Sequence, residues 1–106
     1  MHETAGNADL HQAVTTLLTD DEYRHLQVAL LLRPEQGVLI PRSGGPRKLR
    51  WTAEGRGKRG GARVIYYWAR EEGSLYMLYI YSKNAQADLT PSQVRILGAL
   101  VREEFS

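Results

Sequence analysis

The sequence predicts an α+β domain with two N-terminal helices, an antiparallel meander of three to four strands and a C-terminal helix. Apolar residues recur at helical spacing near both ends of the chain, and its middle is rich in β-branched and aromatic residues. Short turns separate the expected strands, which favours antiparallel pairing. With an apolar fraction of 42%, residues 1–106 suffice for one modest core, so we expect a single domain.

Two helices are predicted in the first third of the chain. Asp9 can cap a first helix, whose apolar stripe runs through residues 10–18. Thr19 begins a capping box that Glu22 completes, so a second helix starts there, and Pro34 ends it. A third helix starts near the C-terminus, where Thr90-Pro91-Ser92-Gln93 forms another capping box with proline at the first helical position. Its buried stripe consists of Val94, Leu97, Leu100 and Val101.

Three strands are predicted between the second and third helices. Residues 37–46 are typical of a loop, because they contain two prolines and a Gly-Gly pair. Strands follow at residues 47–52, 62–69 and 75–81, and a turn at 71–74 joins the last two. We expect the helices to pack on one face of this meander and to leave the other face open to a ligand.

Basic residues are concentrated in one segment. Of fourteen lysines and arginines, eight lie between positions 42 and 63, where Glu54 is the one acidic residue, so the segment carries about seven net positive charges. Such an uneven distribution favours a polyanionic ligand, although a merely solubilising surface is the alternative interpretation. The eight residues are Arg42, Arg47, Lys48, Arg50, Arg56, Lys58, Arg59 and Arg63.

Strand alternation predicts where these charges meet. Lys48 and Arg50 share one face of the first strand, and Arg63 and Tyr67 share one face of the second. If these faces coincide, the three cations converge beside the ring of Tyr67. We expect Arg63 to face solvent, and Lys83, just after the third strand, to complete the cluster. Guanidinium groups bind phosphate oxygens and aromatic rings stack on bases, so the cluster suits single-stranded RNA. We expect the remaining strand aromatics to belong to the core: Tyr66, Trp68, Tyr76, Tyr79 and Tyr81.

Several other functions are disfavoured. Residues 55–60 satisfy G-x-G-x-x-G but lead into a strand, whereas a dinucleotide site requires a helix. The three histidines lack the spacing of metal ligands, and we expect no cofactor or metal. The chain has no cysteine, no apolar run of the roughly 18 residues that span a membrane, and no secretory pattern at its start. We therefore expect a cytoplasmic protein without a membrane partner.

Three ordered blocks carry a resemblance to a known family. They are residues 45–51 (GPRKLRW), 57–67 (GKRGGARVIYY) and 81–90 (YSKNAQADLT), with a further match at 18–24 (LTDDEYR). With these blocks the chain resembles the RelE/ParE superfamily of toxins, closest to the HigB branch, over residues 17–101. The resemblance implies the RelE-like microbial ribonuclease fold and a toxin of a type II toxin–antitoxin system.

The resemblance also implies an activity and partners. Such toxins enter the ribosomal A site and cut messenger RNA, by attack of a 2′-hydroxyl on the adjacent phosphate to give a 2′,3′-cyclic phosphate. A cognate antitoxin protein holds them inactive. By position, the resemblance implies the catalytic residues Lys48, Arg50, Arg63 and Lys83. Arg63 would stabilise charge on the transition state, and either lysine could be the acid or the base. Further RNA-binding residues are expected at Arg47, Arg56, Lys58, Arg59, Tyr67 and Asn84.

The hypothesis has two alternatives and one structural requirement. A ParE-like toxin that inhibits DNA gyrase without nuclease activity would share the scaffold, and so would a non-catalytic RNA-binding module. Catalysis requires the implied cations to gather at one exposed place, free of internal ion pairs. The family's opening strand has a poor counterpart in residues 1–9, so we expect that edge strand to be weak, short or absent.

Overall fold

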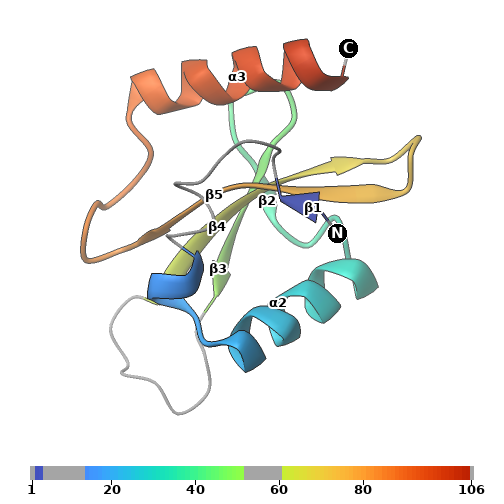
Figure 1. The fold of residues 1–106 in the computed structure, drawn as a ribbon. Coiled ribbons are helices and arrows are strands. Elements are labelled where there is room, and N and C mark those ends of the chain that lie inside the picture. Colours follow the sequence, from blue (N-terminus) through green and yellow to red (C-terminus); the bar gives the residue numbers. More distant parts are fainter. Residues whose placement is uncertain (1, 4–13, 52–60, 106) are drawn as a thin grey trace.

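The computed structural model of the chain describes residues 2–3, 14–51 and 61–105. They form a mixed α+β fold in which a five-stranded sheet lies between two helices (Figure 1). The sheet has the order β1-β5-β4-β3-β2, with β1 parallel to β5 and the other four strands antiparallel. The strands are β1 (His2–Glu3), β2 (Val38–Leu39), β3 (Arg47–Trp51), β4 (Ala62–Ala69) and β5 (Ser74–Ser82).

Both predicted capping boxes are present. Helix α2 (Asp20–Leu32) begins after Thr19, whose Oγ1 accepts a hydrogen bond from Glu22 N while Glu22 Oε1 accepts one from Thr19 N. Helix α3 (Pro91–Phe105) begins in the same way, with reciprocal bonds between Thr90 and Gln93. These bonds satisfy backbone donors that a helix start leaves without partners, which explains why each helix begins where it does.

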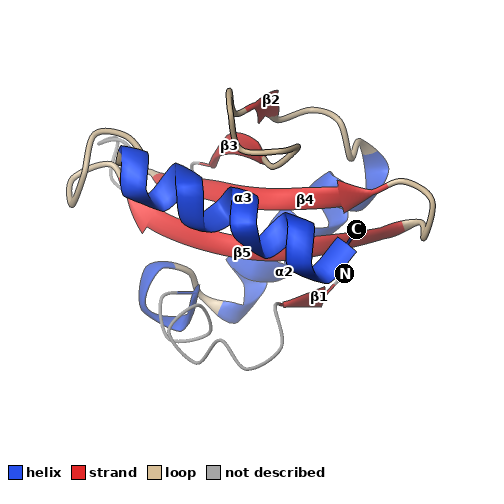
Figure 2. Ribbon diagram, turned by 90° about the horizontal axis from the view of Figure 1, so that it is seen from above, coloured by secondary structure: helices blue, strands red, loops and turns tan. Residues whose placement is uncertain are grey.

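The two helices cover opposite faces of the sheet, so the expectation of helices on one face only is wrong (Figures 1 and 2). Leu26 and Leu30 of α2 pack with the Val64 and Tyr66 side of β4. The other side belongs to α3, whose buried residues form a second cluster with Ile65, Leu78 and Tyr81; they are Leu97 and Val101. Apolar residues on both faces of β4 explain the arrangement, because each face has to be removed from water.

The central strands follow the predicted alternation, with one interruption. On β4, Arg63, Ile65 and Tyr67 share one face, as predicted, and this is the face that α3 covers. A register shift opposite Ile65 and Tyr66 leaves an extra residue in β5, where both Leu78 and Tyr79 belong to the α3-side cluster. The bulge therefore places Tyr79 and Tyr81 on the same face as Arg63.

Both edges of the sheet are short strands. Residues 37–46 are not entirely a loop, because Val38 and Leu39 pair with Lys48 and Arg47 as strand β2. The N-terminal edge strand is short, as expected, and pairs His2 and Glu3 with β5. Residues 14–17 are helical, in agreement with the first predicted helix, whereas its predicted start at Asp9 lies outside the described residues.

Candidate functional site

The strand register brings three predicted cations onto the α3 face of the sheet. Arg50 of β3 lies opposite Arg63 of β4, and Arg63 lies opposite Tyr81 of β5, so these side chains form one row across three strands. In the next row, Lys48 lies opposite Ile65. Directly opposite residues of an antiparallel pair have Cβ atoms about 5 Å apart. Lys48, Arg50 and Arg63 are therefore neighbours, because the two strand faces coincide.

Arg63 differs from the prediction in its exposure. Arg63 is only 7% exposed, so the expectation that its side chain faces solvent is wrong. The α3-side cluster, to which its strand neighbour Ile65 belongs, accounts for this burial. Arg50, by contrast, is exposed at the end of the row. Two like charges directly opposite each other on adjacent strands repel, which favours the binding of an anion beside them.

Lys48 is engaged in an ion pair with Asp88, which comes from the segment before α3. Lys48 Nζ lies 3.1 Å from Asp88 Oδ1, and the two side chains are 30% and 68% exposed. Asp88 Oδ1 also accepts a hydrogen bond from Leu89 N at 2.7 Å. This backbone bond, Lys48 and the charge of Arg63 hold the pKa of Asp88 below its usual value. The carboxylate is thus an ionised anion beside the cations of the site.

A network of polar side chains holds the segment of Asp88 on the sheet. Gln86 Nε2 donates to the Asp88 carbonyl at 2.8 Å and to Gln93 Oε1 at 2.9 Å. Gln93 Nε2 in turn lies 3.4 Å from the hydroxyl of Tyr79. Since Gln93 also caps α3 through Thr90, one side chain links the helix start and the sheet to the Gln86 amide that holds the backbone of Asp88.

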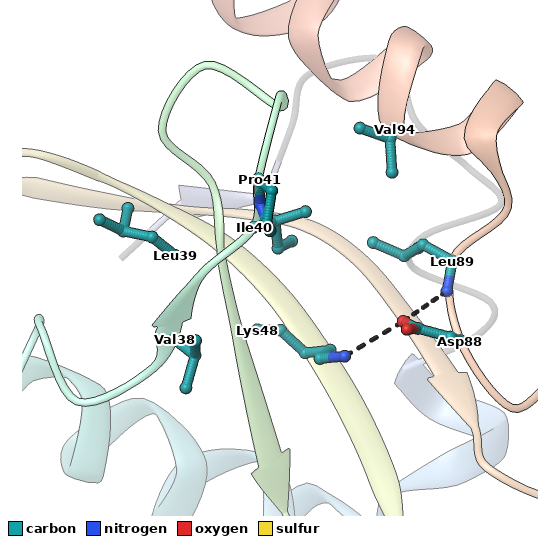
Figure 3. Close-up of a pocket in the computed structure, with 8 residues that line it drawn as sticks. All are labelled: Val38, Leu39, Ile40, Pro41, Lys48, Asp88, Leu89 and Val94. Carbon is teal, nitrogen blue, oxygen red and sulfur yellow. Dashed lines mark hydrogen bonds and ion pairs between the residues drawn. The ribbon is translucent and has the colours of Figure 1, made fainter.

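A pocket of about 230 Å³ lies beside the ion pair (Figure 3). Its walls are mostly apolar, and Lys48 and Asp88 supply its charged groups. The remaining lining residues come from the edge strand, the loop after it and the start of α3: Val38, Leu39, Ile40, Pro41, Leu89 and Val94. An apolar recess next to an ammonium group is suited to a flat, partly polar ring that continues from a bound anion.

Lys83 and Asn84 lie in the exposed turn after β5. Lys83 N donates to Gly61 O at 3.3 Å, and Asn84 N donates to Ser82 Oγ at 3.1 Å. Lys83 is thus two residues beyond Tyr81, at the Arg63 end of the strands. Its position is compatible with the predicted cluster, at its rim.

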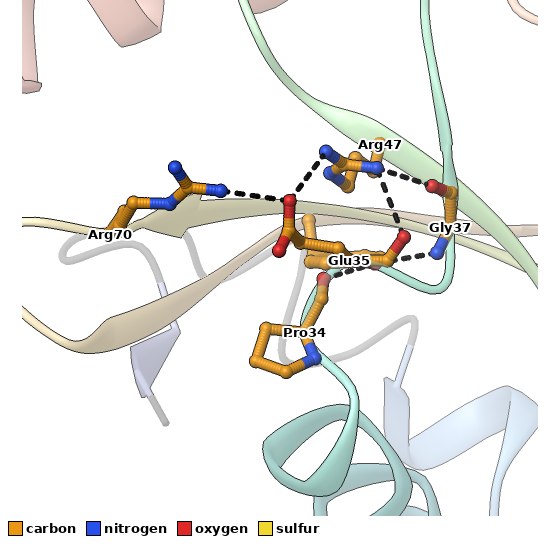
Figure 4. A network of polar contacts seen from close by, with 6 residues as sticks. Pro34, Glu35, Gly37, Arg47 and Arg70 are labelled. Carbon is orange, nitrogen blue, oxygen red and sulfur yellow. Dashed lines mark hydrogen bonds and ion pairs between the residues drawn. The ribbon is translucent and has the colours of Figure 1, made fainter.

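Arg47 lies apart from the cluster. Its Nη1 donates to the carbonyl oxygens of Glu35 and Gly37, and its Nη2 lies 3.7 Å from the Glu35 carboxylate, which also pairs with Arg70 (Figure 4). With these contacts Arg47 fastens the α2–β2 connection. The prediction that it binds RNA draws no support from this position.

The other predicted RNA contacts divide into two groups. Tyr67 is on the Arg63 face but is partly buried in the α3-side cluster. Its ring packs so closely on Gly45 that a Cβ added there would lie 3.0 Å from Tyr67 Cε1, so one edge of the ring is covered by the loop before β3. Arg56, Lys58 and Arg59 lie outside the described residues.

Sequence reasoning missed Asp88 and Tyr81 as members of the site. Asp88 is 40 residues from Lys48 in sequence, and no local pattern links the two. Tyr81 could have been found, because alternation backward from Lys83 places it on the same face. Its burial agrees with the prediction that it belongs to the core.

Comparison with models of known protein families gives no match. Within residues 2–3, 14–51 and 61–105, no three His, Asp or Glu side chains gather as a metal site would require. No helix of the described part combines the length and the apolar character that a membrane crossing needs.

Proposed function

We propose that the chain is a HigB-like member of the RelE/ParE superfamily with the RelE-like fold, and that it cuts messenger RNA in the ribosomal A site. It would act in the cytoplasm as the toxin of a type II toxin–antitoxin pair, with an antitoxin protein as its partner. Two lines support this proposal. The sequence blocks at 45–51, 57–67 and 81–90 resemble the family in order and spacing, and the meander with its C-terminal helix is compatible with the family's fold.

The single observation that carries the proposal is the gathering of basic side chains on one face. Arg50 and Arg63 are directly opposite each other, and Lys48 is in the adjacent row. An RNA phosphate is the ligand whose charge and several acceptor oxygens best match two guanidinium groups and an ammonium group. The pocket beside Lys48 offers room for part of the adjoining nucleotide.

The reaction proposed for this site is a transesterification within the RNA. The 2′-hydroxyl loses its proton and its oxygen attacks the adjacent phosphorus, while the bond from phosphorus to the 5′-oxygen breaks. The products are a 2′,3′-cyclic phosphate and a 5′-hydroxyl, whose oxygen receives a proton. Arg50 and Arg63 would stabilise the extra charge on the phosphorane-like transition state, and Lys48 or Lys83 would move the protons.

The structure does not meet the requirement that the cations be exposed and free of internal ion pairs, because Lys48 is paired with Asp88 and Arg63 is buried. A partly exposed ion pair contributes only about 0–1 kcal/mol, so Asp88 can be displaced by a better anion. A buried guanidinium acts in a lower dielectric, where its effect on a transition-state charge is greater than in water. The proposal therefore expects conformational adjustment around Asp88 when RNA binds.

The test is cleavage of messages on programmed ribosomes by the purified full chain. New ends should map within translated codons and carry 5′-hydroxyl groups. Arg50→Ala is the cleanest variant, because Arg50 is exposed, and it should lower the cleavage rate by about 100-fold. Arg24→Ala removes an exposed arginine of α2 and serves as the matched control. Full cleavage by Arg50→Ala contradicts the assigned role.

Two other results would redirect the assignment. RNA binding without new 5′-hydroxyl ends would leave a non-catalytic binding module. Inhibition of DNA supercoiling by gyrase, with messages left intact, would instead indicate a ParE-like activity. Induction in growing bacterial cells, with message 5′ ends mapped against the reading frame, separates these outcomes in one experiment.

A further inference from the structure

The hydroxyl group of Tyr81 is buried without a hydrogen-bond partner among the described residues. Tyr81 is only 4% exposed, and its ring packs beside Tyr79 with centroids 5.6 Å apart. A buried hydroxyl without a partner is destabilising, and most buried polar groups in proteins are paired. The Tyr81 hydroxyl is therefore a donor that the described part of the chain does not satisfy.

Tyr81 belongs to the row of side chains that contains Arg63, its cross-strand neighbour on β4. Burial raises the pKa of Tyr81, the negative charge of Asp88 raises it further, and the positive charge of Arg63 opposes this. Both groups therefore act on the hydroxyl, which stays protonated and able to donate at neutral pH.

Asp88 occupies the place that an anionic ligand would take. Its carboxylate is within 3.1 Å of Lys48 Nζ and interacts electrostatically with Arg63. A carboxylate and a phosphate present the same type of acceptor, but the phosphate has more oxygens in a tetrahedral arrangement. A phosphate can thus accept from more donors of the site than Asp88 does.

We propose that Tyr81 is a further substrate-contacting residue, whose hydroxyl donates a hydrogen bond to the RNA phosphate once that phosphate displaces the carboxylate of Asp88. The inference rests on the proposed function and deepens it, because it identifies a further hydrogen-bond donor of the site and the group that occupies the site when no RNA is bound. That group is the carboxylate of Asp88. It neutralises the cations in the absence of RNA and competes with RNA for them.

The proposal separates Tyr81 from an ordinary core tyrosine. If Tyr81 only packs, Tyr81→Phe removes an unsatisfied polar group and leaves RNA binding unchanged. If it contacts the phosphate, the same variant stays folded, with unchanged or higher stability, and binds RNA less well. Tyr76→Phe is the matched control, because Tyr76 also belongs to β5 and its hydroxyl contacts Glu72 at the exposed turn.

The experiment measures the affinity of the full chain for a single-stranded 2′-O-methyl oligoribonucleotide, which cannot be cut, by fluorescence anisotropy at low salt. Tyr81→Phe should bind about tenfold more weakly than the wild type, since a hydrogen bond to a charged group is lost. Asp88→Asn should bind up to about fivefold more tightly, because a competing partly exposed ion pair is removed. Asp21→Asn, which changes the same charge in an exposed pair of α2, should have no effect.

Equal affinity of wild type and Tyr81→Phe, including binding by neither, overturns the proposal. Weaker binding by Asp88→Asn also overturns it, since that result makes Asp88 a positioning residue for Lys48. Cleavage on programmed ribosomes is measured separately. Cleavage by the wild type with unchanged binding by both variants leaves the proposed function standing and refutes the inference. If the affinities change as expected but the wild type cuts no message, the inference stands and the proposed function is refuted.

Discussion

The substitution Tyr66→Phe offers the most direct test of how the fold positions the site. Tyr66 is fully buried in β4, and its hydroxyl donates to Pro34 O at 2.7 Å and accepts from Gly37 N at 2.8 Å. These two bonds fasten the connection between α2 and β2. The edge strand that lines the pocket with Val38 and Leu39 begins immediately after it.

The expected loss follows from the burial of these partners. Gly37 is buried, so its N–H has no access to water once the hydroxyl is gone, and an unsatisfied buried donor costs about 1–3 kcal/mol. The bond to Pro34 O adds about 1 kcal/mol, and that carbonyl can recover part of it because Pro34 is only partly buried. We expect a total loss of about 2–3 kcal/mol, equivalent to a fall in Tm of roughly 10–20 °C for a domain of this size.

Urea unfolding followed by circular dichroism measures the effect, with Tyr76→Phe as the matched control. The hydroxyl of Tyr76 contacts an exposed carboxylate, so its removal should change stability by no more than about 0.5 kcal/mol. A Tyr66→Phe protein as stable as the Tyr76→Phe protein would refute the reasoning, because the connection would then not depend on the buried hydroxyl.

Two other predictions concern stability. Thr19→Ala removes the capping box of α2 and should cost about 1 kcal/mol in chemical unfolding, whereas Thr16→Ala in an exposed position should be nearly neutral; equal effects of the two would argue against the cap. The pKa of Asp88 is lower in the folded than in the unfolded protein. Ionised Asp88 therefore contributes to the free energy of unfolding above its unfolded pKa of about 3.9, and this contribution is lost as the pH falls through its folded pKa. The stability difference between wild type and Asp88→Asn should therefore be constant from pH 5 to 8 and shrink in acid, and a difference independent of pH down to 2 would contradict the ionised pair.

Local chemistry made the helix starts and strand faces predictable from the sequence. Thr19 with Glu22, and Thr90 with Gln93, satisfy backbone donors within four residues, so the pattern contains the whole cause. Alternation along β3 and β4 likewise depends on the chain alone. It placed Lys48 with Arg50 on one face of β3 and Arg63 with Tyr67 on one face of β4, whereas the coincidence of these faces follows from the strand register.

The remaining features depend on contacts between distant segments. No local sequence pattern predicts that α3 packs over the Arg63 face of the sheet. The apolar side chain of Ile65 on that face did indicate that the face is removed from water. The burial of Arg63 follows from this packing and could not be predicted from its own strand. The pairing of Lys48 with Asp88 joins residues 40 positions apart. Strand β2 was missed because two residues are too few to establish a period.

Gln93 gives the molecule a property that neither the helix nor the site has alone. The amide that completes the first turn of α3 is also the anchor for Gln86, and through it for the backbone of Asp88. Fraying of the α3 N-terminus would consequently also loosen the segment that carries Asp88, whose carboxylate pairs with Lys48. A protein that binds α3 and opens its first turn would therefore weaken the support of this ion pair, although it contacts neither Lys48 nor Asp88.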